Sequence, residues 1–340
     1  MSQYLIGIDI GGTTVKFGLF NTENFPKTEA QFAIPTHTEN EGANILPDTS
    51  DAIMQMLRDH DLSREDIAGI GVGVPGPVIT DNETGSTLVN RCVNLGWNLK
   101  NVAAELSRMT AIHRVTVMND ANAAALGELS CGSGGDTHDI SVAFRDMTAV
   151  LITIGTGVGG GIVQHGQVIT GVSGCAGEFG HIKLSPVHPL LQKVIREGGD
   201  VAPFEDFEYY ASATGIIRMA KVGAEVLYPD SQLAGCKDMG AKEVFAAAKD
   251  GDPLALEVTD FFFDTFGLGM AIVTAGIDPD VLIIGGGVAG EGEPLLKRIK
   301  GAYQKYAFHG VYDTELRLAA LGNDAGLIGP VVPIYLSTQQ

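Results

Sequence analysis

The sequence predicts an α/β protein made of two similar lobes, and three observations support that prediction. Through the first 120 residues, segments with the apolar alternation of strands are interspersed with segments that have the apolar spacing of helices, which is typical of α/β architecture. The segment IGIDIGGT at 6–13 returns in outline as ITIGTGVGG at 152–160. The length of 340 residues is enough for two domains. A duplication of this kind indicates two lobes with a cleft between them, a favoured place for ligands.

The elements of the first half follow from their local patterns. Alternation predicts strands at 5–10 and 15–19, joined by the turn Gly11-Gly12-Thr13-Thr14. A helix is expected around Asp51–Asp61, with Ser50 or Asp51 as its cap. The remaining elements of this half are a glycine-rich strand at 67–74, a helix capped by Asn98 and a strand at 115–118 that leads into Asn119-Asp120.

The second half repeats the opening and then becomes mostly helical. Residues 149–166 read as a strand, a glycine turn and a second strand. Helices are expected at 207–226, 241–249, 254–277 and 294–306, with a strand at 281–287. The apolar stretch Phe261–Ile277 is interrupted by Asp264 and is shorter than the ~20 residues of a membrane span. A buried helix is therefore expected there.

Composition narrows the class of protein. The 22 basic and 41 acidic residues give a net charge of −19, which argues against a nucleic-acid or anionic-membrane surface. The scattered Cys92, Cys131, Cys175 and Cys236 contain no C-x-x-C pair and indicate a reducing compartment. The first nine residues have neither a basic start nor a cleavage site. We expect a cytoplasmic protein with no nucleic-acid or membrane partner.

Glycine is the most informative residue type, supplying 45 of 340 positions against a usual share of ~7%. Gly155–Gly160 and Gly285–Gly290 both match the dinucleotide fingerprint G-x-G-x-x-G. The first is followed by a strand and so fails the structural requirement of that fingerprint. The second precedes a helix but has no further βαβ unit after it, so both a tight strand-to-helix turn and a binding turn stay open there. A P-loop motif does not occur. Glycine turns let backbone N–H groups converge on an anion, so such hairpins could hold a polyphosphate and a nucleoside.

Several motifs together carry a family resemblance. DIGGTTVKFGLF (9–20), NDANAAALGE (119–128), ITIGTGVGGGIV (152–163) and LIIGGGVAG (282–290) occur in the order found in the actin, sugar-kinase and heat-shock superfamily. GCAGEFGH (174–181) and YYASATGI (209–216) narrow the resemblance to the repressor, open-reading-frame and kinase (ROK) family, and the chain is most similar to its glucokinases. The resemblance covers essentially the whole chain.

This resemblance implies a two-lobed actin/hexokinase-like fold, which is a duplicated ribonuclease H-like fold with its active-site cleft between the lobes. The implied domains are an N-terminal small α/β domain at 1–118 and a C-terminal large α/β domain at 119–322. A C-terminal helix at about 323–336 is expected to pack back on the first domain. Relatives are commonly homodimers, so a homodimer is expected.

The implied reaction is transfer of the γ-phosphoryl group of ATP to a hexose, with glucose giving glucose 6-phosphate. Asp120 matches the general base that accepts the hydroxyl proton. By position alone, Asp120 would be a helix N-cap, since ANAAALGEL follows it. The sugar-binding residues that the resemblance implies are Gly76, Asn94, Asn119, Asp120, Glu178, His181 and Glu208.

The resemblance also implies where ATP and Mg²⁺ bind. Asp9 matches a carboxylate near the metal, which it would contact through water. Lys16 is interpreted as a solvated lysine on an edge strand. The implied nucleotide- and phosphate-binding residues are Asp9, Gly11, Gly12, Thr13, Thr156, Gly157, Gly286 and Gly287.

The chain departs from the family at its zinc motif. Most members carry a zinc site made by a histidine and C-x-C-G-x-x-G-C, whereas the stretch from His181 to Glu208 holds no cysteine. Closed zinc sites require four nitrogen or sulfur ligands at set spacing, so no zinc is expected. His188 is interpreted as a solvated loop residue. The segment PLLQKVIREGG at 189–199 is expected to support His181 instead.

Other functions stay open at this level. The sugar could be N-acetylmannosamine, N-acetylglucosamine or fructose, and the donor could be polyphosphate. A sugar-responsive transcription factor would carry an N-terminal helix-turn-helix, whereas this chain enters its first strand near residue 4. Its charge of −19 also opposes DNA contact. An NAD-dependent oxidoreductase would rest on the glycine fingerprints alone, and the strand after Gly161 counts against it.

Overall fold

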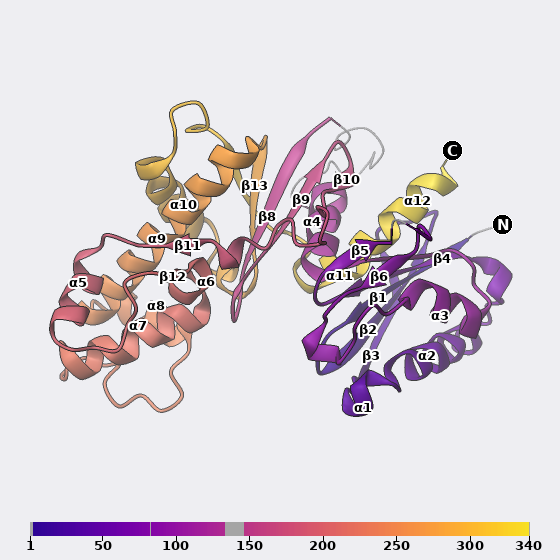
Figure 1. The fold of residues 1–340 in the computed structure, drawn as a ribbon, viewed down its shortest axis with the longest axis horizontal. Coiled ribbons are helices and arrows are strands. Elements are labelled where there is room, and N and C mark those ends of the chain that lie inside the picture. The colour runs from indigo at the N-terminus through magenta and orange to yellow at the C-terminus, as the bar shows by residue number, and fades with distance from the viewer. Residues whose placement is uncertain (1–2, 82, 133–145, 340) are drawn as a thin grey trace. The chain divides into compact units, whose positions relative to one another are not determined.

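The computed structural model describes residues 3–81, 83–132 and 146–339, and the chain forms two compact units. Unit 1 consists of Met1–Ala149, Gly161–Gly177 and Ala320–Gln340, and unit 2 of Val150–Gly160 and Glu178–Ala319. Both strands and helices make up a large part of the chain (Figure 1). The predicted α/β class is therefore confirmed.

The sheet of unit 1 has the strand order β3-β2-β1-β4-β7. Its strands are β1 Tyr4–Ile10, β2 Thr14–Asn21, β3 Thr28–Pro35, β4 Ile67–Val74 and β7 Val115–Asn119. Strands β1, β4 and β7 run parallel, whereas β2 and β3 return antiparallel. Because parallel strands end at the same edge, Asp9, Gly76 and Asp120 all follow or close strands at one edge of this sheet. The edge strand β3 is mostly exposed, so it lacked the apolar alternation that predicts a strand.

Helices and the C-terminal segment cover the two faces of this sheet. Helices α2 Ile45–Asp59 and α3 Val102–Thr110 share one apolar cluster with strand residues such as Ile6 and Ile8. The alternate residue Gly7 faces Leu327, whose carbonyl oxygen would lie 2.2 Å from any added Cβ. Figure 1 shows the yellow C-terminal helices beside the indigo strands. The other elements of this unit are α1 Glu39–Gly42, β5 Val78–Thr80, β6 Thr87–Val89, α4 Asp120–Cys131, α11 Ala325–Ile328 and α12 Val332–Thr338.

A second sheet has the order β10-β9-β8-β13-β14. Its strands are β8 Thr148–Ile154, β9 Val158–Gln164, β10 Gln167–Val168, β13 Val281–Gly285 and β14 Glu315–Leu318, and a separate short ladder joins β11 Lys183–Leu184 to β12 Glu205–Asp206. The helices of unit 2 are α5 Pro189–Arg196, α6 Phe207–Ala211, α7 Ala213–Val226, α8 Ala241–Lys249, α9 Pro253–Ile277 and α10 Glu293–Tyr306. The predicted glycine hairpin is confirmed as the β8–β9 connection.

Helix α9 is the central helix of unit 2. It packs against α5, α6, α7, α8 and α10 and buries Phe261, Phe262 and Phe266. Its 25 residues agree with the predicted helix at 254–277 to within one residue, and by length and composition alone it could cross a membrane. However, 61% of its most apolar window is buried inside the protein. The prediction of a buried helix is confirmed, although the argument from a short length was wrong.

Several predicted boundaries shift for local reasons. Helix α2 begins six residues before Asp51, and it accommodates Pro47 in its first turn, where the missing N–H needs no partner. Helix α3 is capped by Asn101, whose side chain accepts the N–H of Ala104, rather than by Asn98. The expected helix 207–226 breaks at Ser212, an extended residue whose hydroxyl caps α7.

The compact units also differ from the predicted domain ranges. Helix α4 groups with unit 1 because it packs on α11, where a Cβ at Gly127 would lie 2.6 Å from the carbonyl oxygen of Ala325. The C-terminal segment is divided at Gly329-Pro330 into short helices and packs on β1 and β4. The domain assignment at 1–118 and 119–322 stays a prediction.

Candidate active site

The junction of β7 and α4 positions the predicted base. Asn119 is buried and caps α4, because its Oδ1 accepts the N–H groups of Ala121 and Asn122 at 3.0 and 3.1 Å. Asp120 is therefore the first helical residue and is exposed, so the alternative that Asp120 is the cap is wrong. The Nδ2 group of Asn119 donates to Oδ1 of Asp120 at 2.9 Å. Both the amide and the helix N-terminus stabilise an ionised carboxylate here.

The same amide ties Asp120 to the turn after β4. Asn119 Nδ2 also donates to the carbonyl oxygen of Gly76 at 3.1 Å, and Gly76 adopts a left-handed φ of 82°. A Cβ at Gly76 would lie 3.3 Å from Cys92, two residues before the exposed Asn94. Gly12 approaches the same segment, since its Cβ would lie 4.0 Å from that of Asn94. Unit 1 thus gathers the first glycine turn and four predicted sugar residues.

Asp9 is the next-to-last residue of β1, at the same edge of the sheet. Its Oδ2 lies 3.5 Å from Nζ of Lys16, the residue opposite it on β2. Burial raises the pKa of Asp9, and the ammonium of Lys16 opposes that shift. Lys16 is not an edge lysine, because β3 lies outside β2, so that interpretation was wrong. Its ion-pair partner within unit 1 is Asp9.

In unit 2, the β8–β9 turn is built around Glu208. Oε2 of Glu208 accepts the N–H of Val158 at 3.2 Å. A Cβ at Gly157 would lie 2.4 Å from that oxygen, and one at Gly180 would lie 3.1 Å from it. Both positions therefore leave room for the carboxylate of a predicted sugar residue. The second glycine turn and Glu208 form one contact group.

Glu178 immediately precedes a short 3-10 helix at Phe179–His181, His181 is its last residue, and both side chains are exposed. His181 Nδ1 lies 3.8 Å from Oδ2 of Asp206. Within the described residues, the ion-pair partner of His181 therefore lies on β12, which pairs with β11. Helix α5, which begins the segment 189–199, packs instead on α7 and α9. The expectation that 189–199 supports His181 is not what the contacts show.

His188 has a structural role in place of the expected solvated one. It is 7% exposed, and its Nδ1 accepts the N–H of Leu190 at the start of α5. Its Nε2 lies 3.4 Å from Oδ2 of Asp260 on α9. Within the described residues, no group of three or more His, Cys, Asp or Glu side chains could hold a metal ion.

The third glycine turn follows β13. Gly286 has a φ of 86°, and a Cβ there would lie 2.3 Å from the carbonyl oxygen of Ile154 on β8. A glycine is therefore required by packing alone. Gly287 has no atom within 4 Å of an added Cβ, so packing does not account for it.

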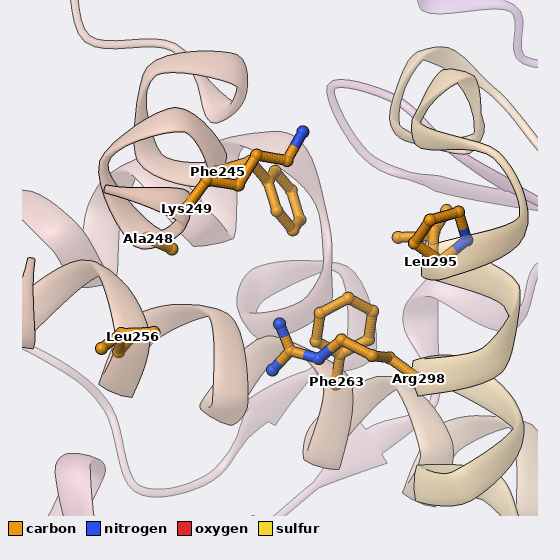
Figure 2. A pocket seen from close by; sticks show the side chains of 8 residues that line it. Phe245, Ala248, Lys249, Leu256, Phe263, Leu295 and Arg298 are labelled. Carbon is orange, nitrogen blue, oxygen red and sulfur yellow. The ribbon is translucent and has the colours of Figure 1, made fainter. Parts of the chain in front are cut away.

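A separate apolar hollow of about 150 Å³ lies between α8, α9 and α10 (Figure 2). The guanidinium of Arg298 lies over the ring of Phe263, 4.0 Å from its centroid. The remaining lining residues are Phe245, Ala248, Lys249, Leu256, Pro294 and Leu295. None of them is a predicted site residue, so this hollow is separate from the candidate active site.

The sequence model of the ROK family matches residues 5–333. The chain belongs to the ROK family. It is 38% identical to a glucokinase of Halalkalibacterium halodurans over 338 residues, covering 96% of this chain and 93% of that protein. It is 32% identical to a glucokinase of Thermotoga maritima, covering 96% and 95%.

Solved structures agree with this ROK assignment. The ROK family glucokinase of Streptomyces griseus, in complex with glucose and AMPPNP, has a TM-score of 0.67 and 28% identity, covering 96% of this chain and 97% of that one. The two-lobed hexokinase-like fold is therefore confirmed. The predicted cleft and the roles of the site residues stay predictions.

Sequence reasoning missed two threonines that contact the glycine turns. Thr36 follows β3 and contacts the first turn, and Thr214 lies in the first turn of α7 and contacts the second. Thr214 belongs to the motif YYASATGI, which pointed to the family but to no chemistry. Thr36 lies in no motif, and its contact depends on β3 pairing with β2.

Proposed function

We propose that this protein phosphorylates glucose with ATP, giving glucose 6-phosphate and ADP. The observation that carries the proposal is Asp120, an exposed carboxylate at the start of α4 whose capping role is taken by Asn119. The glucokinases similar to this chain over almost its whole length support the choice of glucose.

Asp120 would act as the general base. As the sugar hydroxyl oxygen bonds to the γ-phosphorus, its proton passes to the carboxylate of Asp120. The bond between the γ-phosphorus and the bridging oxygen breaks, and ADP leaves with that electron pair. Asn119 holds the carboxylate at 2.9 Å and is itself fixed by Gly76. The base is thus oriented before the substrate arrives.

The proposed partners of the sugar hydroxyls are the residues that the family resemblance implies, namely Asn94, Asn119, Glu178, His181 and Glu208. Amide, imidazole and carboxylate groups match a ring of hydroxyls, and a sugar lacking one partner leaves a polar group unpaired. The phosphates would be bound by the turns at 11–13 and 156–157, and the nucleoside by Gly286 and Gly287.

Mg²⁺ fits this arrangement as a cation brought with the nucleotide. It prefers oxygen ligands and usually keeps waters while taking one or two carboxylates and the phosphates. Asp9 offers a carboxylate with a 22% exposed side chain, beside the first turn. Bound there, Mg²⁺ would neutralise phosphate charge, and Asp9 would hold it through water.

The decisive experiment replaces Asp120 with alanine. A general base contributes about 10²- to 10⁴-fold, so kcat should fall by at least 10² while the variant stays folded and still binds glucose. Asp51→Ala, which removes another exposed carboxylate from a helix of unit 1, is the matched control and should keep wild-type kcat. An Asp120→Ala protein that keeps a tenth of wild-type kcat has another base.

The sugar and the donor are tested with one panel. Glucose, fructose, N-acetylmannosamine and N-acetylglucosamine are each supplied with ATP or polyphosphate, and phosphorylated product is measured. Glucose with ATP should give the highest kcat/KM. We also infer a cytoplasmic homodimer, and light scattering of the purified protein tests the dimer.

A further inference from the structure

Each of the first two glycine turns is held by a threonine from another element. In unit 1, the Thr36 hydroxyl donates to the carbonyl oxygen of Gly11 at 2.7 Å, and the Thr36 N–H donates to that of Thr13 at 2.9 Å. In unit 2, the Thr214 hydroxyl donates to the carbonyl oxygen of Thr156 at 2.7 Å. In both turns a threonine hydroxyl donates to a carbonyl oxygen of the turn, although one threonine follows a strand and the other lies at the start of a helix.

The second turn has one further bond from the same helix. The N–H of Ala213 donates to the carbonyl oxygen of Gly155 at 2.9 Å. Two successive carbonyl groups of this turn therefore point at the start of α7.

Peptide geometry converts these contacts into a direction for the N–H groups. A trans peptide is planar, and its C=O and N–H point to opposite sides. Fixing the Gly11 carbonyl therefore turns the Gly12 N–H away from Thr36. Fixing the carbonyls of Gly155 and Thr156 likewise turns the N–H groups of Thr156 and Gly157 away from α7.

The N–H groups turned outward are the ones left for a ligand. The N–H of Gly11 donates to Thr14, and that of Gly155 donates to Gly157. Among the described residues, the N–H groups of Gly12, Thr156 and Gly157 have no hydrogen-bond acceptor. Gly12 and Thr156 are also exposed. Outward, unpaired N–H groups of successive residues make an anion site.

We propose that Thr36 and Thr214 are positioning residues for phosphoryl transfer, which aim the turn N–H groups at the phosphates of the nucleotide. The proposal rests on the proposed function in one respect, namely that both turns bind phosphate. In this proposal each threonine acts through the backbone of its turn, because its hydroxyl donates to a turn carbonyl oxygen.

The test compares variants that differ only in the hydroxyl. Thr214→Val keeps the branched shape and loses the donor, whereas Thr214→Ser keeps the donor. Losing one such hydrogen bond should weaken binding of MgAMPPNP, measured by calorimetry, roughly threefold to tenfold. The serine variant should bind as the wild type does. Thr36→Val and Thr36→Ser should repeat this pattern at the first turn.

A control and a second readout separate positioning from folding. Thr314 also donates its hydroxyl to a carbonyl oxygen, that of Val311 at 2.8 Å, so Thr314→Val should leave nucleotide affinity unchanged. In steady-state assays, Thr214→Val should raise the KM for ATP more than the KM for glucose. A general loss of folding would instead lower the active fraction and change neither KM.

The outcomes distinguish this proposal from the proposed function. If the wild type binds MgAMPPNP but does not phosphorylate glucose, the proposed function fails, and the binding comparison still tests the threonines. Wild-type nucleotide affinity in both valine variants overturns the positioning role. So does an equal loss in the serine variants, because the hydroxyl would then be irrelevant.

Discussion

Replacing Gly157 with alanine tests whether the second glycine turn and the sugar site share the carboxylate of Glu208. The new Cβ would lie 2.4 Å from Oε2 of Glu208, roughly 1 Å inside ordinary contact. Gly157 has no left-handed φ, so alanine suits the backbone there. The obstacle is the end of a flexible side chain, which can rotate away. The substitution should therefore displace Glu208 and leave the turn folded.

The size of the effect follows from what Glu208 loses. Its Oε2 accepts the Val158 N–H at 3.2 Å, and the carboxylate is a proposed partner of a glucose hydroxyl. A hydrogen bond to a charged group contributes about 1.5–3 kcal/mol. Glucose affinity should therefore fall roughly tenfold to hundredfold, at about 1.4 kcal/mol per factor of ten.

Glucose binding without nucleotide, measured by calorimetry, isolates this effect from phosphate binding. Gly155→Ala is the matched control, because a Cβ at Gly155 would have no atom within 4 Å. The glucose affinity of this variant should equal that of the wild type. In a Glu208→Ala background, Gly157→Ala should not lower glucose affinity any further, because the carboxylate that the new Cβ would displace is already absent. Unchanged glucose affinity in Gly157→Ala, or full additivity with Glu208→Ala, would refute the reasoning.

Two further predictions concern stability, measured by urea unfolding. Glu128 is 1% exposed and accepts the N–H groups of Ala320 and Leu321 at 2.9 and 2.7 Å, so Glu128→Gln should lower the unfolding free energy by about 2–3 kcal/mol. An unchanged value would mean that the amide satisfies both donors. At Asp252, the cap of α9, burial raises the pKa, but hydrogen bonds from backbone N–H groups and Ser231 outweigh it and lower the pKa overall. The ionised cap thus stabilises the fold above about pH 4, and Asp252→Ala should lose about 1–2 kcal/mol at pH 7. This difference should shrink as pH falls through the lowered pKa, and a constant difference between pH 7 and pH 3 would contradict it.

Local patterns predicted most elements correctly where one face of an element is apolar. β1, β2 and β4 alternate or are apolar, and α8 matches its predicted bounds, because such patterns report burial directly. Patterns failed where neighbours supply the stabilisation. Strand β3 is held by pairing with β2, and its own sequence shows little alternation.

The candidate site divides in the same way. The motifs carried the family resemblance, and through it Asp120 and the glycine turns could be named from the sequence. The role of Asn119 as the cap could not, since either residue suits an N-cap and only the backbone decides which one occupies it. Likewise, nothing near Lys16 in the sequence indicates that it pairs with Asp9, because the strand register brings them opposite each other.

By itself, the sequence determined the α/β class, the duplicated glycine hairpins and the family, because these depend on residue types at short spacing. Tertiary structure decided why particular residues are required. Gly157 leaves room for a carboxylate that is 51 positions away in the chain, and Thr36 and Thr214 fix turns from separate elements. Such contacts join segments whose approach is set by strand pairing and helix packing. The physical reason is that a hydrogen bond depends on final position and direction, which no local pattern encodes.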